Sequence, residues 1–213
     1  MTIEQQVLIG PHALTGDLFV PAAPHGLVVF AHGSGSSRHS PRNRSVAEAL
    51  HAHRLGTLLF DLLTETEGHD AANVFDIGLL AGRLLQAMTW TRERPDLSRL
   101  RLGLFGASTG AAAALVAAAE RPQQVSAVVS RGGRPDLAGA AVLEQVRAPT
   151  LLLVGAQDVE VLALNRDALD LMRCEKWLEV VPRATHLFEE AGALQRVAAA
   201  AGDWFERHLG SST

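Results

Sequence analysis

Cysteine is almost absent from this sequence of 213 residues, in which Cys174 is the only one. A single cysteine excludes an internal disulfide and a cysteine-rich zinc site, so we expect Cys174 to be an inert helix residue and expect no metal. The sequence also lacks apolar runs of membrane-spanning length, and residues 1–6 have neither the basic residues nor the apolar stretch of an export signal. We therefore expect a cytoplasmic protein with no membrane partner.

No excess of positive charge is present, because the formal net charge is −4 and no long basic block interrupts the chain. This balance argues against a nucleic-acid partner. The hydrophobic content of 47% and charged content of 20% are ordinary for one domain covering residues 1–213. The oligomeric state is left open, with a homodimer among the possible assemblies.

Apolar strand patterns alternate with helical patterns along most of the chain. Two short segments before Pro21 predict an antiparallel edge hairpin, and the later strands predict a parallel sheet with helices on both faces. Reactive loops then gather at the carboxyl ends of the strands. The expected strands are 2–8, 14–20, 27–31, 57–60, 100–105, 125–130, 150–154 and 177–181. The expected helices are 40–53, 74–92, 110–120, 137–146, 161–173 and 189–209, with a polar loop at 61–70.

The sequence Gly106-Ala107-Ser108-Thr109-Gly110 reads as a strand end, a sharp turn and a helix start. Small residues on both sides of Ser108 allow the strand and the helix to pass each other, and the turn raises the serine hydroxyl above the sheet edge. Ser108 is therefore a candidate nucleophile. The alternative is a glycine-rich loop whose serine merely caps a helix.

An acid and a histidine follow Ser108 in the order that suits nucleophilic catalysis. Asp158 and His186 each come just after a predicted strand. A serine hydroxyl is a weak nucleophile at neutral pH, so His186 would take its proton, while Asp158 would hold the imidazole tautomer. Asp136 and Glu160 are competing acids, and Asp158 is preferred because of its place after the strand.

His32 and His208 compete with His186 for the role of base, and His51 and His53 are a candidate metal pair. His32 directly follows a buried strand, and we expect it to bind loop backbone as a structural residue. His208 sits near the end of a helix, where solvent contact is the simpler explanation. His51 and His53 are two residues apart and would diverge on a helix, which argues against a metal pair.

Backbone amides near Ser108 are candidates for an oxyanion hole. The Thr109 N–H lies at the positive end of the predicted helix and points toward any oxyanion that forms beside Ser108. His32-Gly33-Ser34-Gly35 follows a buried strand, and its glycines allow a tight turn that exposes N–H groups. We expect Ser34 to be the second donor, with Gly33 as the next choice.

Arginines gather at residues 37–44, where a helix is expected to begin, although a helix dipole favours negative side chains there. This mismatch suggests a bound anion. We expect Arg38 or Arg42, with Arg131 as a further candidate, to hold a carboxylate or phosphate of the substrate. The alternative is that these arginines pair with acids at 65–70 or lie in solvent.

The four motifs together resemble the α/β-hydrolase superfamily and, within it, the dienelactone hydrolase-like group, which includes small hydrolases encoded beside phosphoribosyltransferase domains. The motifs are Gly106 to Gly110, His32 to Gly35, Gly155 to Asp158 and Ala184 to Phe188. The resemblance covers nearly the whole chain. It implies an eight-stranded, mostly parallel sheet, the triad at Ser108, Asp158 and His186, and the oxyanion hole at Ser34 and Thr109.

Two departures from relatives restrict the expected chemistry. Dienelactone hydrolase itself uses a cysteine nucleophile, whereas this elbow holds serine and Cys174 lies far along the chain, so the resemblance does not carry dienelactone over as substrate. The stretch 131–135 is too short for a cap domain.

We expect a serine hydrolase without cofactor that cleaves an ester or thioester of a small acyl substrate. The rival is a non-catalytic ligand-binding module on the same fold.

Overall fold

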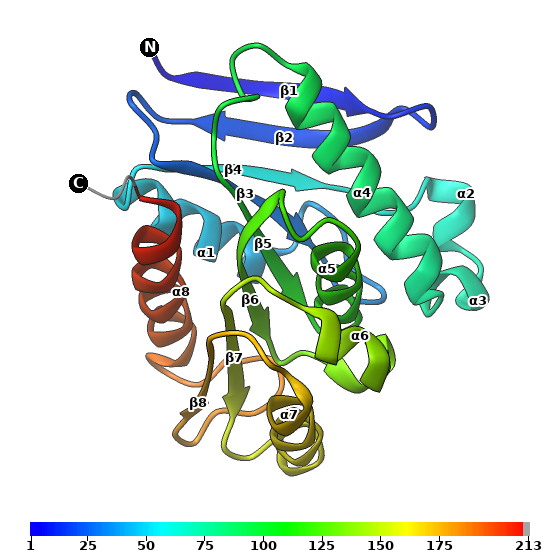
Figure 1. Ribbon diagram of the computed structural model, residues 1–213, viewed down its shortest axis with the longest axis vertical. Helices are drawn as coiled ribbons and strands as arrows, with labels where there is room; N and C mark the ends of the chain where they lie inside the picture. The colour runs from blue at the N-terminus through cyan, green and yellow to red at the C-terminus, as the bar shows by residue number, and fades with distance from the viewer. Residues whose placement is uncertain (211–213) are drawn as a thin grey trace.

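The computed structural model describes residues 1–210 and contains a single eight-stranded sheet (Figure 1). The strand order is β1-β2-β4-β3-β5-β6-β7-β8. Strands β1, β2 and β4 pair antiparallel in succession, and every pairing from β4 through β3 to β8 is parallel. The expected mixed sheet with an antiparallel amino-terminal hairpin is confirmed. The strands are β1 (Ile3–Ile9), β2 (Leu14–Val20), β3 (Gly26–Ala31), β4 (Leu55–Phe60), β5 (Leu102–Ala107), β6 (Val125–Arg131), β7 (Thr150–Gly155) and β8 (Lys176–Val181).

Helices cover both faces of the sheet and divide the core into two main clusters. Helices α1 and α8 cover one face, and α4, α5, α6 and α7 cover the other (Figure 1). All residues of β3, β4, β5 and β7 are buried, as expected for parallel strands covered on both faces. The helices are α1 (Pro41–Ala52), α2 (Glu65–Gly68), α3 (Ala71–Val74), α4 (Ile77–Glu93), α5 (Thr109–Glu120), α6 (Ala140–Gln145), α7 (Val159–Leu171) and α8 (Ala193–Leu209), with a 3₁₀ turn η1 (Pro135–Ala138).

The expected polar loop at 61–70 and the expected helix start at residue 74 are wrong. The segment holds the short helix α2, a second short helix, α3, follows directly after it, and α4 begins at Ile77. Side-chain caps explain the breaks, because Thr64 and Glu67 form a capping box at α2 and Asp76 accepts a hydrogen bond from the Leu79 amide at the start of α4.

Two boundaries at the carboxyl side of the sheet matter for the site. β6 ends at Arg131 and η1 follows at Pro135, so no cap domain is inserted there. α8 begins at Ala193 rather than at residue 189, because Gly192 takes a left-handed conformation with φ 80°. The longer segment between β8 and α8 carries His186.

Candidate active site

Ser108 stands at the tight turn between β5 and α5. Its backbone has φ 51° and ψ −121°, a conformation that is strained for a residue with a side chain. The Ser108 side chain makes no capping hydrogen bond to α5. The alternative that this serine merely caps a helix is therefore wrong, and Ser108 is a half-buried residue at the sheet edge.

Two glycines make this turn sterically possible. A Cβ atom on Gly106 would lie 2.4 Å from the Ala111 Cα, and one on Gly110 would lie 2.2 Å from the Ala31 carbonyl oxygen. In both cases the Cβ atom would overlap a backbone atom, which cannot move independently of its helix or strand. Only glycine therefore fits at these positions, which lie two residues before and two residues after Ser108.

His186 contacts one of the three candidate acids. Its Nδ1 lies 2.6 Å from the Oδ2 of Asp158, whose side chain is 14% exposed against 39% for the imidazole. Asp136 instead accepts two hydrogen bonds from Arg134, at 2.8 and 2.7 Å. Glu160 is exposed in the first turn of α7. A proton on Nδ1 satisfies the Asp158 contact and leaves Nε2 as an acceptor.

Ser108 and His186 border the same glycine loop after β6. The Ser108 amide donates to the carbonyl of Arg131 at 3.2 Å, and a Cβ atom on the next residue, Gly132, would lie 3.5 Å from the Cε1 of His186. Within residues 1–210, no hydrogen bond joins the Ser108 hydroxyl to the imidazole. The structure thus brings Asp158 and His186 into contact and places Ser108 next to them.

The β3 loop, residues 32–39, packs against the elbow. A Cβ atom on Gly33 would lie 3.0 Å from the Cβ of Ser108. The Ser34 amide donates to the Thr109 hydroxyl at 2.9 Å, and so joins the two candidate oxyanion segments. The Thr109 amide is in the first turn of α5 and has no intrahelical acceptor. The Ser34 amide already donates to the Thr109 hydroxyl. To bind an oxyanion, this amide must therefore either share its proton between two acceptors or give up the hydrogen bond to Thr109.

His32 has the structural role expected for it. Its Nδ1 faces the Gly33 carbonyl at 3.0 Å and its Nε2 accepts from the Leu62 amide at 3.1 Å. Burial lowers the pKa of His32, which keeps the imidazole neutral. The residue ties the β3 loop to the segment after β4.

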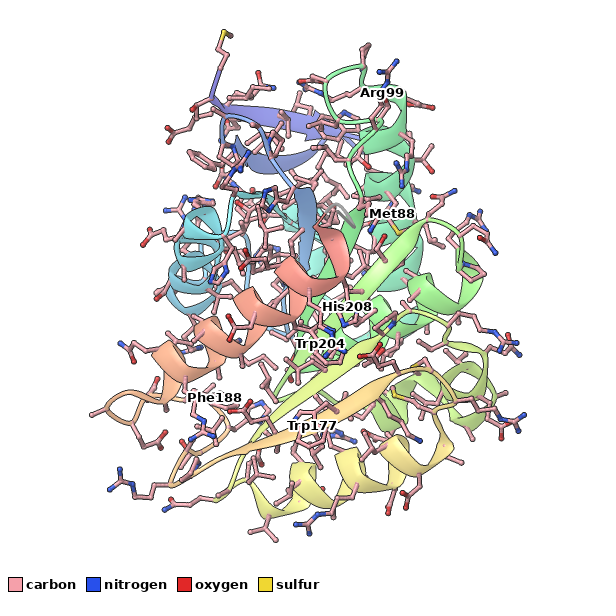
Figure 2. The ribbon with its side chains drawn as sticks, turned by 60° about the vertical axis from the view of Figure 1, so that its left-hand side comes forward. Met88, Arg99, Trp177, Phe188, Trp204 and His208 are labelled. Carbon is pink, nitrogen blue, oxygen red and sulfur yellow. The ribbon has the colours of Figure 1, made fainter. Side chains whose placement is uncertain are left out.

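His51, His53 and His208 make their contacts away from the elbow. Figure 2 shows Phe188 before α8 and His208 near the other end of that helix, beside Trp204, with ring centroids 4.6 Å apart. His51 stacks on Phe19 at 3.8 Å, and His53 contacts a glutamate of α8. Within residues 1–210, no group of three or more histidine, cysteine, aspartate or glutamate side chains is arranged to hold a metal ion.

The predicted arginine cluster separates into different environments. Arg38 is engaged by two carboxylates, those of Asp61 and Asp17, and Arg44 binds Asp17 at 3.1 Å. These partners are not the acids of residues 65–70. Because its charge is already compensated, Arg38 does not suit the role of a substrate-anion ligand. Arg42 and Arg131 have different environments. Arg42 binds Glu189 at 3.2 Å, and this glutamate is 65% exposed. Arg131 is buried, and no carboxylate among residues 1–210 pairs with its guanidinium.

A cavity of about 650 Å³ adjoins the candidate oxyanion segment. Most of its lining residues are polar, and Leu63, Val74 and Leu80 add apolar side chains. The cavity lies on the side of the β3 loop, and neither Ser108 nor His186 is among its lining residues. Its polar lining includes Ser34, Ser36, Ser37, Arg38, His39, Asp61, Thr64 and Glu65.

Comparison with known proteins places the chain in a family, although no model of a protein family matches it. The crystal structure of dienelactone hydrolase from Anabaena variabilis is 54% identical, with a TM-score of 0.92 and coverage of 98% of each chain. Est1E from Butyrivibrio proteoclasticus is 14% identical, with a TM-score of 0.79 over 97% of this chain and 98% of its own, and this likeness shows the fold alone.

Two Mycobacterium tuberculosis proteins named as phosphoribosyl transferases are each 58% identical over 206 residues, which is 97% of this chain. The match takes in 46% of each relative, so the chain spans about half the length of these curated proteins. No helix among residues 1–210 combines the length and apolar character needed to cross a bilayer. Because it is 54% identical to the Anabaena protein over 98% of both chains, the chain belongs to the dienelactone hydrolase-like group of the α/β-hydrolases.

Proposed function

We propose that this protein is a serine hydrolase that cleaves an ester or thioester of a small acyl substrate through an acyl-enzyme on Ser108. The observation that carries the proposal is a strained serine at a strand-to-helix turn beside a hydrogen-bonded His186–Asp158 pair. A nucleophile, a base and a group that orients the base are the parts that acyl transfer requires. Est1E and an esterase domain from Rhodothermus marinus agree with this chain in fold.

In the first half of the reaction, Nε2 of His186 takes the proton of Ser108 as its Oγ attacks the carbonyl carbon. The carbonyl oxygen becomes an oxyanion that accepts hydrogen bonds from the amides of Thr109 and Ser34. When the tetrahedral intermediate collapses, the imidazolium gives its proton to the leaving alcohol or thiol. Asp158 holds Nδ1 and stabilises the imidazolium between the two transfers.

In the second half, water replaces the alcohol or thiol. His186 takes a proton from water as the oxygen attacks the acyl-enzyme, and the proton returns to Ser108 as the ester bond to Oγ breaks. The products are the free acid and the regenerated enzyme. Every step uses residues of this chain and requires no cofactor. The lone free cysteine suits a reducing compartment, and the cytoplasm is the proposed location.

Ser108→Ala tests the proposed nucleophile directly. We expect kcat to fall by on the order of a millionfold, because loss of the nucleophile disables the triad as a unit. The measurement is turnover of a panel of acyl esters and thioesters, with circular dichroism as a check that the variant folds. An alanine variant within tenfold of wild type would contradict the mechanism.

A fluorophosphonate probe separates the hydrolase from a non-catalytic module on the same fold. The probe forms a covalent bond with an activated serine, so wild type should be labelled and Ser108→Ala should not. Absence of labelling and of turnover in the wild type would favour the ligand-binding module instead.

A further inference from the structure

Strand β8 forms one edge of the sheet, and its outer side is open. It is the last strand in the sheet order and pairs only with β7 (Figure 1). The carbonyl of Val181 accepts from the amide of Ala156, directly after β7, and bonding residues alternate along a strand, so the odd-numbered residues of β8 bind β7. The even-numbered residues direct their N–H and C=O groups outward, where no hydrogen bond joins them to the rest of residues 1–210. These residues are Lys176, Leu178 and Val180.

The charged side chains of β8 do not protect this edge. Proteins commonly blunt an open edge strand with charges, and β8 has two candidates, Lys176 and Glu179. The ammonium group of Lys176 donates to the carbonyls of Leu169 and Met172, at 2.5 and 2.6 Å, at the end of α7. Glu179 accepts from the Nε of Arg196 on α8 at 2.6 Å. Both side chains are therefore bound to helices of the same molecule and are not held out beside the open edge.

An exposed tryptophan lies on the same strand. Trp177 is 62% exposed, and Figure 2 shows it on β8. Side chains alternate between the two faces of a strand, so Trp177 lies on the α8 face together with Glu179. Tryptophan is enriched at protein interfaces relative to the rest of the surface. The other edge strand, β1, differs because it exposes the polar run 4–6. Of the two edges, β8 therefore has the composition of an interface.

Charge restricts how β8 can pair with β8 of a second copy. Two-fold pairing of a strand with itself is antiparallel, and the outward groups meet only if the axis passes through a residue position. The registers that overlap most of β8 have this axis at position 177, 178 or 179. An axis at 177 places Glu179 opposite the partner subunit's Glu175, and an axis at 179 places Glu179 opposite the partner subunit's Glu179. Like charges directly opposite each other are destabilising.

An axis at Leu178 avoids both carboxylate pairs. Each outward N–H of β8 then meets an outward C=O of the partner strand. Trp177 falls opposite the partner subunit's Glu179, in a non-hydrogen-bonded pair whose side chains lie close together. Arg196 is 52% exposed and holds Glu179, so its guanidinium is placed to contact the tryptophan ring as a cation–π partner. The edge is therefore complementary to itself in hydrogen bonds and in charge.

We propose that the protein forms a two-fold dimer by antiparallel pairing of β8 with β8 of a second copy, with the axis at Leu178. The pairing joins the two sheets into one continuous sheet across both subunits. The interface contains none of the candidate catalytic residues Ser108, Asp158 and His186. The inference therefore does not depend on the proposed function, and either can fail without the other.

Sedimentation equilibrium tests the dimer. The wild type is measured over about 1–200 µM protein, because a single pair of strands makes a small interface and a weak complex. We expect the average mass to rise with concentration from that of one chain toward that of two. Trp177→Lys should raise the dissociation constant by on the order of tenfold or more, because it removes the aromatic anchor and adds a charge to the edge. A protein that stays monomeric at every concentration overturns the inference.

Further variants separate the β8 edge from other surfaces. Val180→Pro removes an outward N–H and leaves the bonds to β7 intact, so it should weaken the dimer about as much as Trp177→Lys. Leu8→Lys is the matched control, because Leu8 is also 62% exposed but lies on the opposite edge strand, β1. Leu8→Lys and Ser108→Ala should keep the wild-type dissociation constant. A dimer that Leu8→Lys weakens as much as Trp177→Lys does, or that neither β8 variant weakens, overturns the inference.

A cysteine at the axis tests the register. In a Cys174→Ser background, Leu178→Cys should form a disulfide between subunits when oxidised glutathione is added. The two facing Cα atoms of a hydrogen-bonded pair are about 5.5 Å apart, which is within the range of a disulfide. An axis at 177 or 179 would shift the two cysteines apart along the strands. Leu8→Cys in the same background is the control and should stay unlinked. Equal cross-linking of both variants, or a dimer in which Leu178→Cys does not cross-link, overturns the proposed register.

Discussion

At the scale of single residues, the side-chain contacts distinguish acids that look alike in the sequence. Asp136 follows β6, which pairs with β5, and Asp158 follows β7, the next strand of the sheet. Asp136 is occupied by Arg134, whereas Asp158 contacts the imidazole of His186 at 2.6 Å. A carboxylate can hold a histidine tautomer only through direct contact. The geometry thus favours Asp158 as the orienting acid.

Asp158→Asn should lower kcat by on the order of ten-thousandfold, because an amide facing Nδ1 favours the wrong tautomer. Asp136→Asn should stay within a few-fold of wild type, since its carboxylate binds Arg134 and does not contact His186. Steady-state kinetics on the best ester of the panel measures both. The reverse ranking would transfer the orienting role to Asp136.

At the scale of elements, the turn between β5 and α5 depends on close backbone packing. α5 is rich in alanine, and most of its residues are buried against the sheet. Gly110 lies against the end of β3, where the Ala31 and His32 carbonyl oxygens leave no room for a Cβ atom. The same contact that shapes the elbow therefore positions the start of the β3 loop.

Glycine substitutions in two helices test this packing. Gly110→Ala should greatly lower both stability and activity, because its Cβ would overlap backbone atoms of β3. Gly82→Ala in α4 should raise the free energy of unfolding by about 0.5–1 kcal/mol, because alanine has the higher helix propensity and no atom lies within 4 Å of its Cβ. Urea unfolding with an esterase assay measures both. A stable, active Gly110→Ala variant would be incompatible with the described elbow.

At the scale of the whole molecule, three histidines connect stability to pH. Burial is the largest cause that lowers the pKa values of His32, His51 and His208 below 6.5. Between pH 6.5 and their lower folded-state pKa values, these histidines are protonated in the unfolded chain but neutral in the folded protein. The stabilisation is therefore complete above pH 6.5 and is lost as the pH falls toward the lower folded-state pKa values.

Thermal unfolding between pH 7.5 and 5.5 should show this linkage as a falling melting temperature. His32→Leu should be less stable at pH 7.5, because the Leu62 amide loses its acceptor, yet its melting temperature should depend less on pH. Circular dichroism in matched buffers measures both effects. A variant with the same pH slope as wild type would show that His32 does not contribute to the linkage.

The sequence by itself determined the order of the strands and of the long helices, and the candidate catalytic residues. Buried parallel strands leave continuous apolar runs, and Ser40-Pro41 marks the start of α1 through local backbone preferences. The turn at Ser108 can be recognised in the sequence because steric crowding requires glycine at positions 106 and 110, and both positions lie within one five-residue motif. Such signals depend on neighbours along the chain, so they are readable without a structure.

Only the tertiary structure decided which side chains meet. Arg38 binds Asp61 because β3 and β4 are neighbours in the sheet, and Ser34 meets Thr109 because β3 also lies beside β5. No local pattern distinguishes the compensated Arg38 from the unpaired Arg131. Burial and ion pairing depend on the folded arrangement of distant segments, which is why the sequence predicted the cluster of arginines but not their separate environments.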